Sequence, residues 1–413
     1  MSTDATPDPY REALAFGQRL QILRQRRGLT QDQLGGLVAR SGSWVRSLEA
    51  GRLKTPKLPI VLRLAEVLRV RDLSDLTGDQ SMHVNLFTGP GHPRFAAVRD
   101  ALNSLQLGPA EAPPAGHLTA RLARAWQARH SAPNHRDVIG SLLPDLIRDA
   151  QAAVRAAATV ADRKAAQARL AETYFLAQFF CAYQPDAPLV WRVAERGMMA
   201  AQDSEDPHAI GLAAWLTTQA HRESTHLDAA DAVTMETLRY LEPLLPEATT
   251  DVRAVAGALT VEAGLTAARR GETGTAWRYW DEARRLAEGL PAGYFHPVTS
   301  FSRAVIGAHA VTVAVETHAG GESVRQAARA EAEAIPSRPR RARHRVEQAR
   351  AYHLDRQPDV ALATLAQAHE AAPETVQYNG HARRIILEEA EAKNADRRRR
   401  ASELAARMGL LTV

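Results

Sequence analysis

The residues at positions 42, 43, 46 and 47 could read the edges of base pairs, because their spacing groups them on one face of a short helix. They are Gly42, Ser43, Arg46 and Ser47, and Arg46 is the only long hydrogen-bond donor among them. A guanidinium can donate two parallel hydrogen bonds to the O6 and N7 atoms of guanine. The spacing therefore predicts a helix that presents Arg46 outward to a base pair.

Residues 29 to 51 predict two short helices joined by a tight turn, an arrangement that would hold this face outward. Thr30 and Ser41 stand where the N-caps of these helices belong, since hydroxyls there accept hydrogen bonds from free backbone N–H groups. Gly51 suits the left-handed position that follows the second helix. The apolar residues at helical spacing would face inward: Leu34, Leu37, Val38, Val45, Leu48 and, in part, Trp44.

The charge of this part of the chain fits contact with phosphates. From Phe16 to Arg71 there are 12 Lys and Arg residues against 3 Asp and Glu residues, a net charge of +9. The whole chain carries a net charge of only +5, so the rest sums to −4. A basic island of this kind is typical of nucleic-acid binding, although an arginine-rich protein also has arginine-rich solvated surfaces. We expect binding that weakens steeply as salt rises.

Spacing, caps and apolar positions together give a resemblance that covers residues 16–77. The segments FGQRLQILRQRRGLTQDQL, SLEAGR and LPIVLRLAEVLRV with DLSDL resemble a helix-turn-helix domain of the Cro and phage-repressor type, the XRE family. The resemblance implies a five-helix unit with these residues inward: Leu20, Leu23, Leu34, Val45, Leu48, Leu62, Leu64, Leu68 and Leu76. It also implies binding of double-stranded DNA through Gln31 on a phosphate, Ser41, Gly42, Ser43, Trp44, Arg46 and Ser47 on the recognition helix, and Arg52 and Lys54 along the backbone.

Three residues depart from this pattern or from good helix formers. Ala39 stands where a turn glycine is usual in the family, so an L-residue must take or avoid a positive φ there. Gly42 stands where a long polar side chain often reads a base, so direct base contacts could be few. Gly35 lies inside the first helix of the pair, and we expect it to permit a close approach of the backbone.

Composition bounds the remaining chain. Its 413 residues are too many for one small domain, and the scarcity of alternating strand patterns predicts an all-α protein. The single cysteine, Cys181, excludes a disulfide framework and is best interpreted as a buried side chain in a cytoplasmic protein. No signal peptide, membrane span, phosphate loop or catalytic motif is recognisable, so we expect no enzyme, no cofactor, no metal and no membrane partner. We divide the chain into a tail (1–15), the helix-turn-helix domain (16–77), a Pro/Gly-rich linker with one helix (78–116) and a helical domain (117–413).

The helical domain predicts an α-solenoid of helix pairs that resemble tetratricopeptide repeats (TPR). In residues 342–375, Ala349, Tyr352, Ala361, Leu365, Ala368 and Pro373 fall at the positions where such repeats need small, large and helix-ending residues. Residues 257–290 match again through Gly264, Ala267, Ala276, Trp280 and Ala283. Residues 305–338 match weakly, 208–246 match only as a helix pair, and 376–393 with 396–408 resemble a cap.

Stacked pairs present a concave surface, which could bind an effector. The candidate residues are Arg343, Val346, Arg350 and His353 on the first helix of one pair, and Tyr294 and Phe295 in a connection. Two arginines beside apolar residues could hold a carboxylate-ended peptide or an acidic small molecule, but they could equally belong to a solvated basic surface.

These patterns lead to one main hypothesis and its alternatives. The chain is interpreted as a bacterial, cytoplasmic, DNA-binding transcription regulator that forms a homodimer and whose TPR-like domain binds a peptide, small-molecule or protein effector. A dimer is expected because one short recognition helix offers few base contacts, and related domains dock two helices about 34 Å apart. The alternatives are an interaction scaffold that the helix-turn-helix only localises to DNA, and an antitoxin-like or phage-encoded partner.

Overall fold

The computed structural model describes residues 16–53, 55–56, 58–68, 70, 74–77, 91–104, 111–184 and 186–410. In these ranges every regular element is a helix, which confirms the all-α prediction. The chain divides into two compact units: the first contains residues 1–89 and 383–413, and the second contains residues 90–382. None of the described helices combines the length and apolar character needed to span a lipid bilayer.

The first unit contains the predicted five-helix domain. Its helices are α2 (Phe16–Arg26), α3 (Gln31–Leu37), α4 (Gly42–Glu49), α5 (Leu58–Leu68) and α6 (Ser74–Thr77). The nine residues that the family resemblance places inward all join its core; Leu23 and Leu62 are partly buried and pack against the others, which are buried. Leu37, which its spacing also placed inward, is half-buried and lies outside this core. The hydrophobic core that unites these helices fixes the orientation of α3 and α4.

The C-terminal segment from residue 383 onward belongs to this same unit. It contains most of α21 (Gly380–Ala390) and all of α22 (Ala395–Arg407). Arg63 on α5 donates a 2.6 Å hydrogen bond to Glu388, and the Arg384 guanidinium lies 2.6 Å from a carboxylate oxygen of Glu66. These two reciprocal ion pairs attach α21 to α5.

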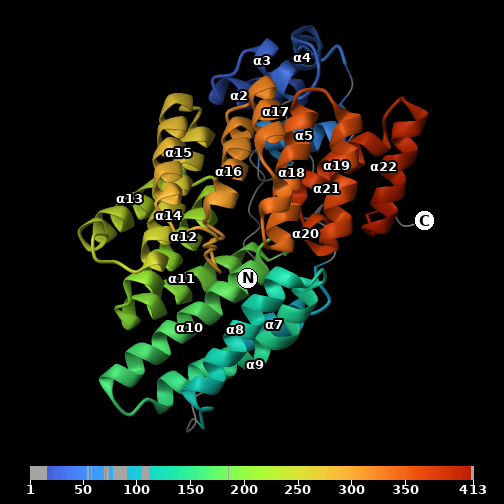
Figure 1. Ribbon diagram of the computed structural model, residues 1–413. Helices are drawn as coiled ribbons and strands as arrows, with labels where there is room; N and C mark the ends of the chain where they lie inside the picture. The colour runs from blue at the N-terminus through green and yellow to red at the C-terminus, as the bar shows by residue number, and fades with distance from the viewer. Residues whose placement is uncertain are drawn as a thin grey trace, which may run out of the picture. The chain divides into compact units, whose positions relative to one another are not determined.

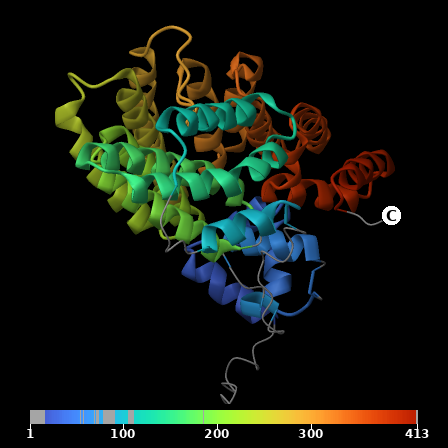
Figure 2. The same cartoon turned by 90° about the horizontal axis from the view of Figure 1, so that it is seen from below.

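The second unit is a series of antiparallel helices. In chain order they are α7 (Phe95–Asn103), α8 (Ala115–Ser131), α9 (His135–Ala156), α10 (Val160–Cys181), α11 (Ala187–Ser204), α12 (Pro207–Glu223), α13 (Leu227–Leu241), η2 (Glu242–Leu244), α14 (Thr250–Arg270), α15 (Thr273–Glu288), α16 (Arg303–Glu316), α17 (Gly320–Arg329), η3 (Ala332–Ala334), α18 (Arg338–Leu354), α19 (Pro358–Ala371) and α20 (Pro373–Gln377). Figure 1 shows α14 beside α15 and α18 beside α19 as pairs. Figure 2 shows the green helices α9, α10 and α11 packed side by side.

Small residues lie where the paired helices cross, as the repeat pattern predicts. Ala349, Ala361, Leu365 and Ala368 are fully buried between α18 and α19. In the pair α14–α15, a Cβ built on Gly264 would lie 3.2 Å from the carbonyl oxygen of Ala276, so a side chain here would push the two helices apart by a few tenths of an ångström. The TPR-like reading of these two pairs is confirmed at the level of packing.

Candidate functional site

The N-caps that define the two short helices form as predicted. The Thr30 hydroxyl accepts a 3.1 Å hydrogen bond from the backbone N–H of Gln33, and the Gln33 side chain accepts one of 2.7 Å from the N–H of Thr30. This reciprocal pair is a capping box. The Ser41 hydroxyl likewise accepts a 3.1 Å hydrogen bond from the N–H of Trp44. Both helix starts are therefore fixed by the side chains of their own N-cap residues.

The turn between the helices depends on two small residues. Ala39 adopts φ 52°, so this L-residue does take the left-handed conformation where the family usually has glycine. A Cβ on Gly35 would lie 2.8–2.9 Å from backbone atoms of Arg40, Ser41 and Gly42, which no side chain can displace cheaply. Gly35 is thus required for the close approach of α3 to the turn, and Gly51 ends α4 with φ 70° as expected.

Gly42 is the residue whose predicted orientation is wrong. It is buried rather than outward-facing, because the first turn of α4 packs against α3. A Cβ on Gly42 would lie 2.9 Å from the Cα of Asp32 and would overlap the Asp32 carboxylate. The absence of a side chain at position 42 therefore serves the packing of the two helices.

The other predicted residues of α4 remain accessible to different degrees. Ser43 and Arg46 are exposed, while Trp44 and Ser47 are half-buried. The guanidinium of Arg40 lies over the Trp44 ring, 5.9 Å from its centroid. Beyond the helix, Arg52 is exposed, and Lys54 lies outside the described residues.

A chain of polar contacts connects the buried core of this domain to Arg46. Glu49 accepts two hydrogen bonds from the buried Arg24 guanidinium, at 2.6 and 3.0 Å, and a third of 2.8 Å from the Gln31 amide. The side-chain oxygen Oε1 of Gln31 accepts a 3.1 Å hydrogen bond from Nε of Arg46. The hydrogen bond to Glu49 raises the pKa of Arg24, so this guanidinium stays charged. Gln31 is therefore a link that orients Arg46.

Sequence analysis did not assign a role to Glu49 or Arg24. Both side chains are almost completely buried, with 4% and 10% of their surface exposed. A carboxylate at the end of a helix, with an arginine on an earlier helix, is a weak signal because several other acidic and basic residues of the domain could pair in the same way. Arg24 and Arg63 were both counted in the basic island, but each is buried in an ion pair, Arg24 with Glu49 and Arg63 with Glu388. These two arginines therefore do not belong to the exposed basic surface.

The basic surface that remains is carried by exposed arginines of this domain. They are Arg26, Arg27, Arg40, Arg46 and Arg52. Arg26 and Arg27 follow one another at the end of α2, and the other three lie before, on and after α4. A positively charged surface around an exposed recognition helix can neutralise phosphates while one side chain reaches a base edge.

The four predicted effector residues on α18 are either paired with carboxylates or buried. Arg350 is within 2.8 Å of Glu316 and 2.7 Å of Glu347, and Arg343 lies 3.0 Å from Glu347. Val346 is completely buried, so the expectation that it lines an open face is wrong: α18 turns it into the packed interior. His353 is also buried, with 8% of its surface exposed.

The two aromatic candidates make contacts elsewhere in the same unit. The Tyr294 hydroxyl donates a 2.5 Å hydrogen bond to Asp251, at the start of α14. Phe295 packs edge-on against the His130 ring, with centroids 5.5 Å apart, and against the small core of Val305, Ala308 and Ile335. Both therefore fasten the connection between α15 and α16 to its neighbours.

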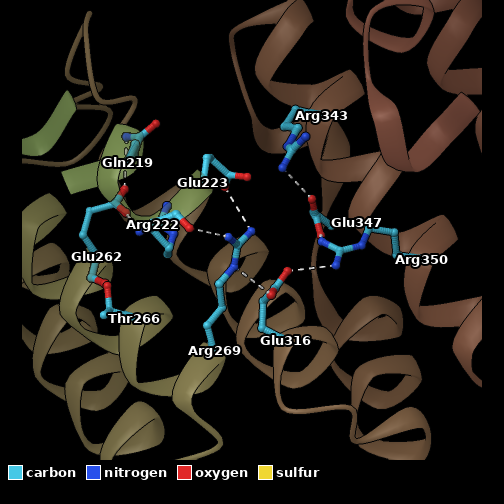
Figure 3. Close-up of polar contacts among 10 residues, drawn as sticks. All are labelled: Gln219, Arg222, Glu223, Glu262, Thr266, Arg269, Glu316, Arg343, Glu347 and Arg350. Carbon is cyan, nitrogen blue, oxygen red and sulfur yellow. Dashed lines mark hydrogen bonds and ion pairs between the residues drawn. The ribbon is translucent and has the colours of Figure 1, made fainter. Parts of the chain in front are cut away.

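Arg343 and Arg350 belong to an extended ion-pair network on α12, α14, α16 and α18 (Figure 3). Arg269 donates to Glu223 and to Glu316, at 3.0 Å each, and Arg222 pairs with Glu262. Burial alone would raise the pKa of Glu316, but Arg269 and Arg350 hold it well below its ordinary value. Burial would likewise raise the pKa of Glu347, and Arg350 and Arg343 lower it. The two predicted effector arginines thus already have carboxylate partners within the protein.

The comparisons with known proteins agree with the geometry of the first unit. Residues 15–76 match the family described as a helix-turn-helix domain, so this part of the chain is a helix-turn-helix domain. No curated protein matches the chain. A crystal structure of Bacillus thuringiensis PlcR in complex with the peptide PapR7 and DNA aligns with 12% identity over 86% of this chain and 99% of that one. Its TM-score is 0.26, too low to establish a shared arrangement.

Proposed function

We propose that this chain is a DNA-binding transcription regulator of the XRE type rather than an enzyme. The observation that carries the proposal is the exposed Arg46 on α4, held by Gln31 and Glu49 within a helix-turn-helix domain. Arg46 would reach a base edge, and the exposed arginines around it would contact phosphates on either side. We also propose that the protein acts as a homodimer, since one such helix offers few base contacts.

The variant Arg46→Ala tests whether α4 recognises the base sequence. We expect the variant to bind its preferred site more weakly by about 1–3 kcal/mol and to lose preference at one base pair, as for a lost bidentate contact. The preferred site would be found by selection from random-sequence DNA, and affinities for it and for random DNA would be measured at one fixed salt concentration. Arg26→Ala, an exposed arginine of the same domain, should weaken both affinities equally. An equal loss for Arg46→Ala would assign Arg46 to the DNA backbone.

Gln31→Ala should also change sequence preference, although the family resemblance implies only a phosphate contact. Without the side-chain oxygen of Gln31, Nε of Arg46 loses its hydrogen-bond partner at 3.1 Å, and the Arg46 side chain is free to rotate. We expect a loss of about 0.5–1.5 kcal/mol at the preferred site, with a smaller loss on random DNA. Gln33→Ala is the matched control on the same helix, because its side chain bonds the N–H of Thr30 and not Arg46. Identical losses on both DNAs would leave Gln31 as a phosphate contact alone.

A further inference from the structure

Three arginines of the second unit lie around the place where α8 adjoins α18, and Arg129 is close enough to the other two for their charges to act on it. We call Arg129, Arg136 and Arg340 the arginine cluster. Next to Arg129, the His130 ring lies 2.8 Å from the hydroxyl of Ser337, the residue that caps α18 one turn before Arg340. Arg136 lies in the first turn of α9 and donates a 2.8 Å hydrogen bond to the carbonyl oxygen of Phe180. Residues far apart in the sequence thus bring three positive charges together.

The arginine cluster has no carboxylate partner among the described residues. Arg129 lies over the Phe179 ring, 4.0 Å from its centroid, and Arg340 lies 3.1 Å from Nε2 of His309. Each of the three guanidinium groups has a buried nitrogen without a hydrogen-bond partner, namely NH1 of Arg129 and Nε of Arg136 and Arg340. Arg136 is itself only 7% exposed. Buried charges in proteins are normally paired, so this arrangement is incomplete as it stands.

The acidic residues nearest to the cluster are already engaged. Glu347 pairs with Arg343 and Arg350, and Glu262 pairs with Arg222. Glu374 accepts hydrogen bonds from the backbone N–H groups of Arg136 and Asp137 at 2.6 and 3.3 Å, so it caps α9. None of these carboxylates can turn to the cluster without abandoning its present partners.

The lowered pKa values of two of these arginines show that their positive charge is unfavourable at this place. Burial, together with the charges of Arg136 and Arg340, lowers the pKa of Arg129 to about 9. Burial also lowers the pKa of Arg340 to about 10, with Arg343 acting in the same direction. Tyr183, which is 45% exposed, lies near Arg136 and Arg340, and the centroid of its ring is 5.9 Å from the guanidinium carbon of Arg343. Arg129 and Arg340 each keep part of their surface open to solvent, while the nitrogens that lack partners are buried.

We propose that the arginine cluster binds an anion with at least two negative charges, a phosphate ester or a dicarboxylate, with the exposed Tyr183 ring beside it. The oxygens of such a group would accept the hydrogen bonds that the guanidinium nitrogens do not make within the protein. The binding of an anion by the cluster does not depend on the proposed function. Only its role as the effector site of a regulator rests on that function. The ligand would connect α8, α9 and α18, and could thereby change the arrangement of the helix pairs.

The test is the thermal unfolding of the full chain with pyrophosphate or citrate, compared with potassium chloride at equal ionic strength. At a hundredfold excess over Kd we expect a Tm rise on the order of 5 °C for one of the two anions. The double variant Arg129→Gln/Arg340→Gln should have a higher Tm than wild type without anion, because like charges no longer repel, and should lose the anion-dependent rise. Arg284→Gln, an exposed arginine paired with Glu288, should behave as wild type.

The outcomes separate this inference from the proposed function. Pyrophosphate and citrate distinguish a phosphate ester from a dicarboxylate. The double variant keeps every arginine of the helix-turn-helix domain, so loss of the rise in that variant excludes this basic domain as its source. If neither anion raises Tm more in wild type than in the double variant, or if the double variant is less stable or unfolded without anion, the arginines are structural and the inference fails. DNA binding by wild type is measured in parallel, so its absence would contradict the proposed function and leave the anion site standing.

Discussion

Glu49→Leu is expected to destabilise the first unit by about 3–5 kcal/mol, because it leaves the buried Arg24 guanidinium without a carboxylate. Arg24 is only 8% exposed, and two of its hydrogen bonds, at 2.6 and 3.0 Å, go to Glu49. Gln31 would also lose its 2.8 Å partner, and with it the fixed position from which it holds Arg46. Urea unfolding measures the first effect, and affinity for the preferred DNA site measures the second.

The double variant Arg24→Met/Glu49→Leu separates these two effects. Replacing both members of a buried ion pair with apolar residues is often neutral for stability, so most of the loss should be recovered. The Gln31 amide would still lack its carboxylate, so affinity for the preferred site should remain low. If the double variant recovered full DNA affinity, Glu49 would act only through stability, and the polar chain to Arg46 would have no role in reading.

The local features of the helix-turn-helix domain could be predicted because they depend on residues close in sequence. Thr30 and Ser41 lie three positions before the N–H groups that they accept from. The sequence left open whether Ala39 takes a positive φ, and the structure shows that it does. The orientation of Gly42 could not be predicted in this way. It depends on the distance between α3 and α4, which is set by the packing of Gly35 against the turn.

The ion pairs between helices of the second unit could not be predicted from the sequence, because their members lie far apart in the chain. Small residues at the crossing of α18 and α19 repeat with a fixed spacing, so the pair was recognisable. The partners of Arg350, in contrast, include Glu316 on a different helix pair, 34 positions away. Arginines that appear available in the sequence are therefore paired in the fold, whereas Arg129 and Arg340, which the sequence did not single out, have no carboxylate partner in the part of the chain that the structure describes.

Glu316→Gln should have the largest effect on the stability of the second unit. Glu316 on α16 accepts from Arg269 on α14 at 3.0 Å and from Arg350 on α18 at 2.8 Å, so it joins three helices (Figure 3). Its side chain is 13% exposed, and its two partners are 16% and 10% exposed. Glutamine keeps the shape but removes the charge, which leaves an excess positive charge in the network. We expect a loss of about 3–5 kcal/mol in the free energy of unfolding at neutral pH.

The pH dependence of this loss identifies the charge of Glu316 as its cause. The pKa of Glu316 is held well below its ordinary value of 4.5 in the folded protein, so its contribution is fully present above pH 4.5. As the pH falls below 4.5, the unfolded chain takes up a proton first, and the difference between wild type and Glu316→Gln should narrow. Glu236→Gln is the control, since Glu236 forms an exposed pair with Arg239 and should change nothing measurable. A difference that stayed constant down to the acid unfolding of wild type would mean that the glutamine disturbs packing, and the network would not depend on this carboxylate.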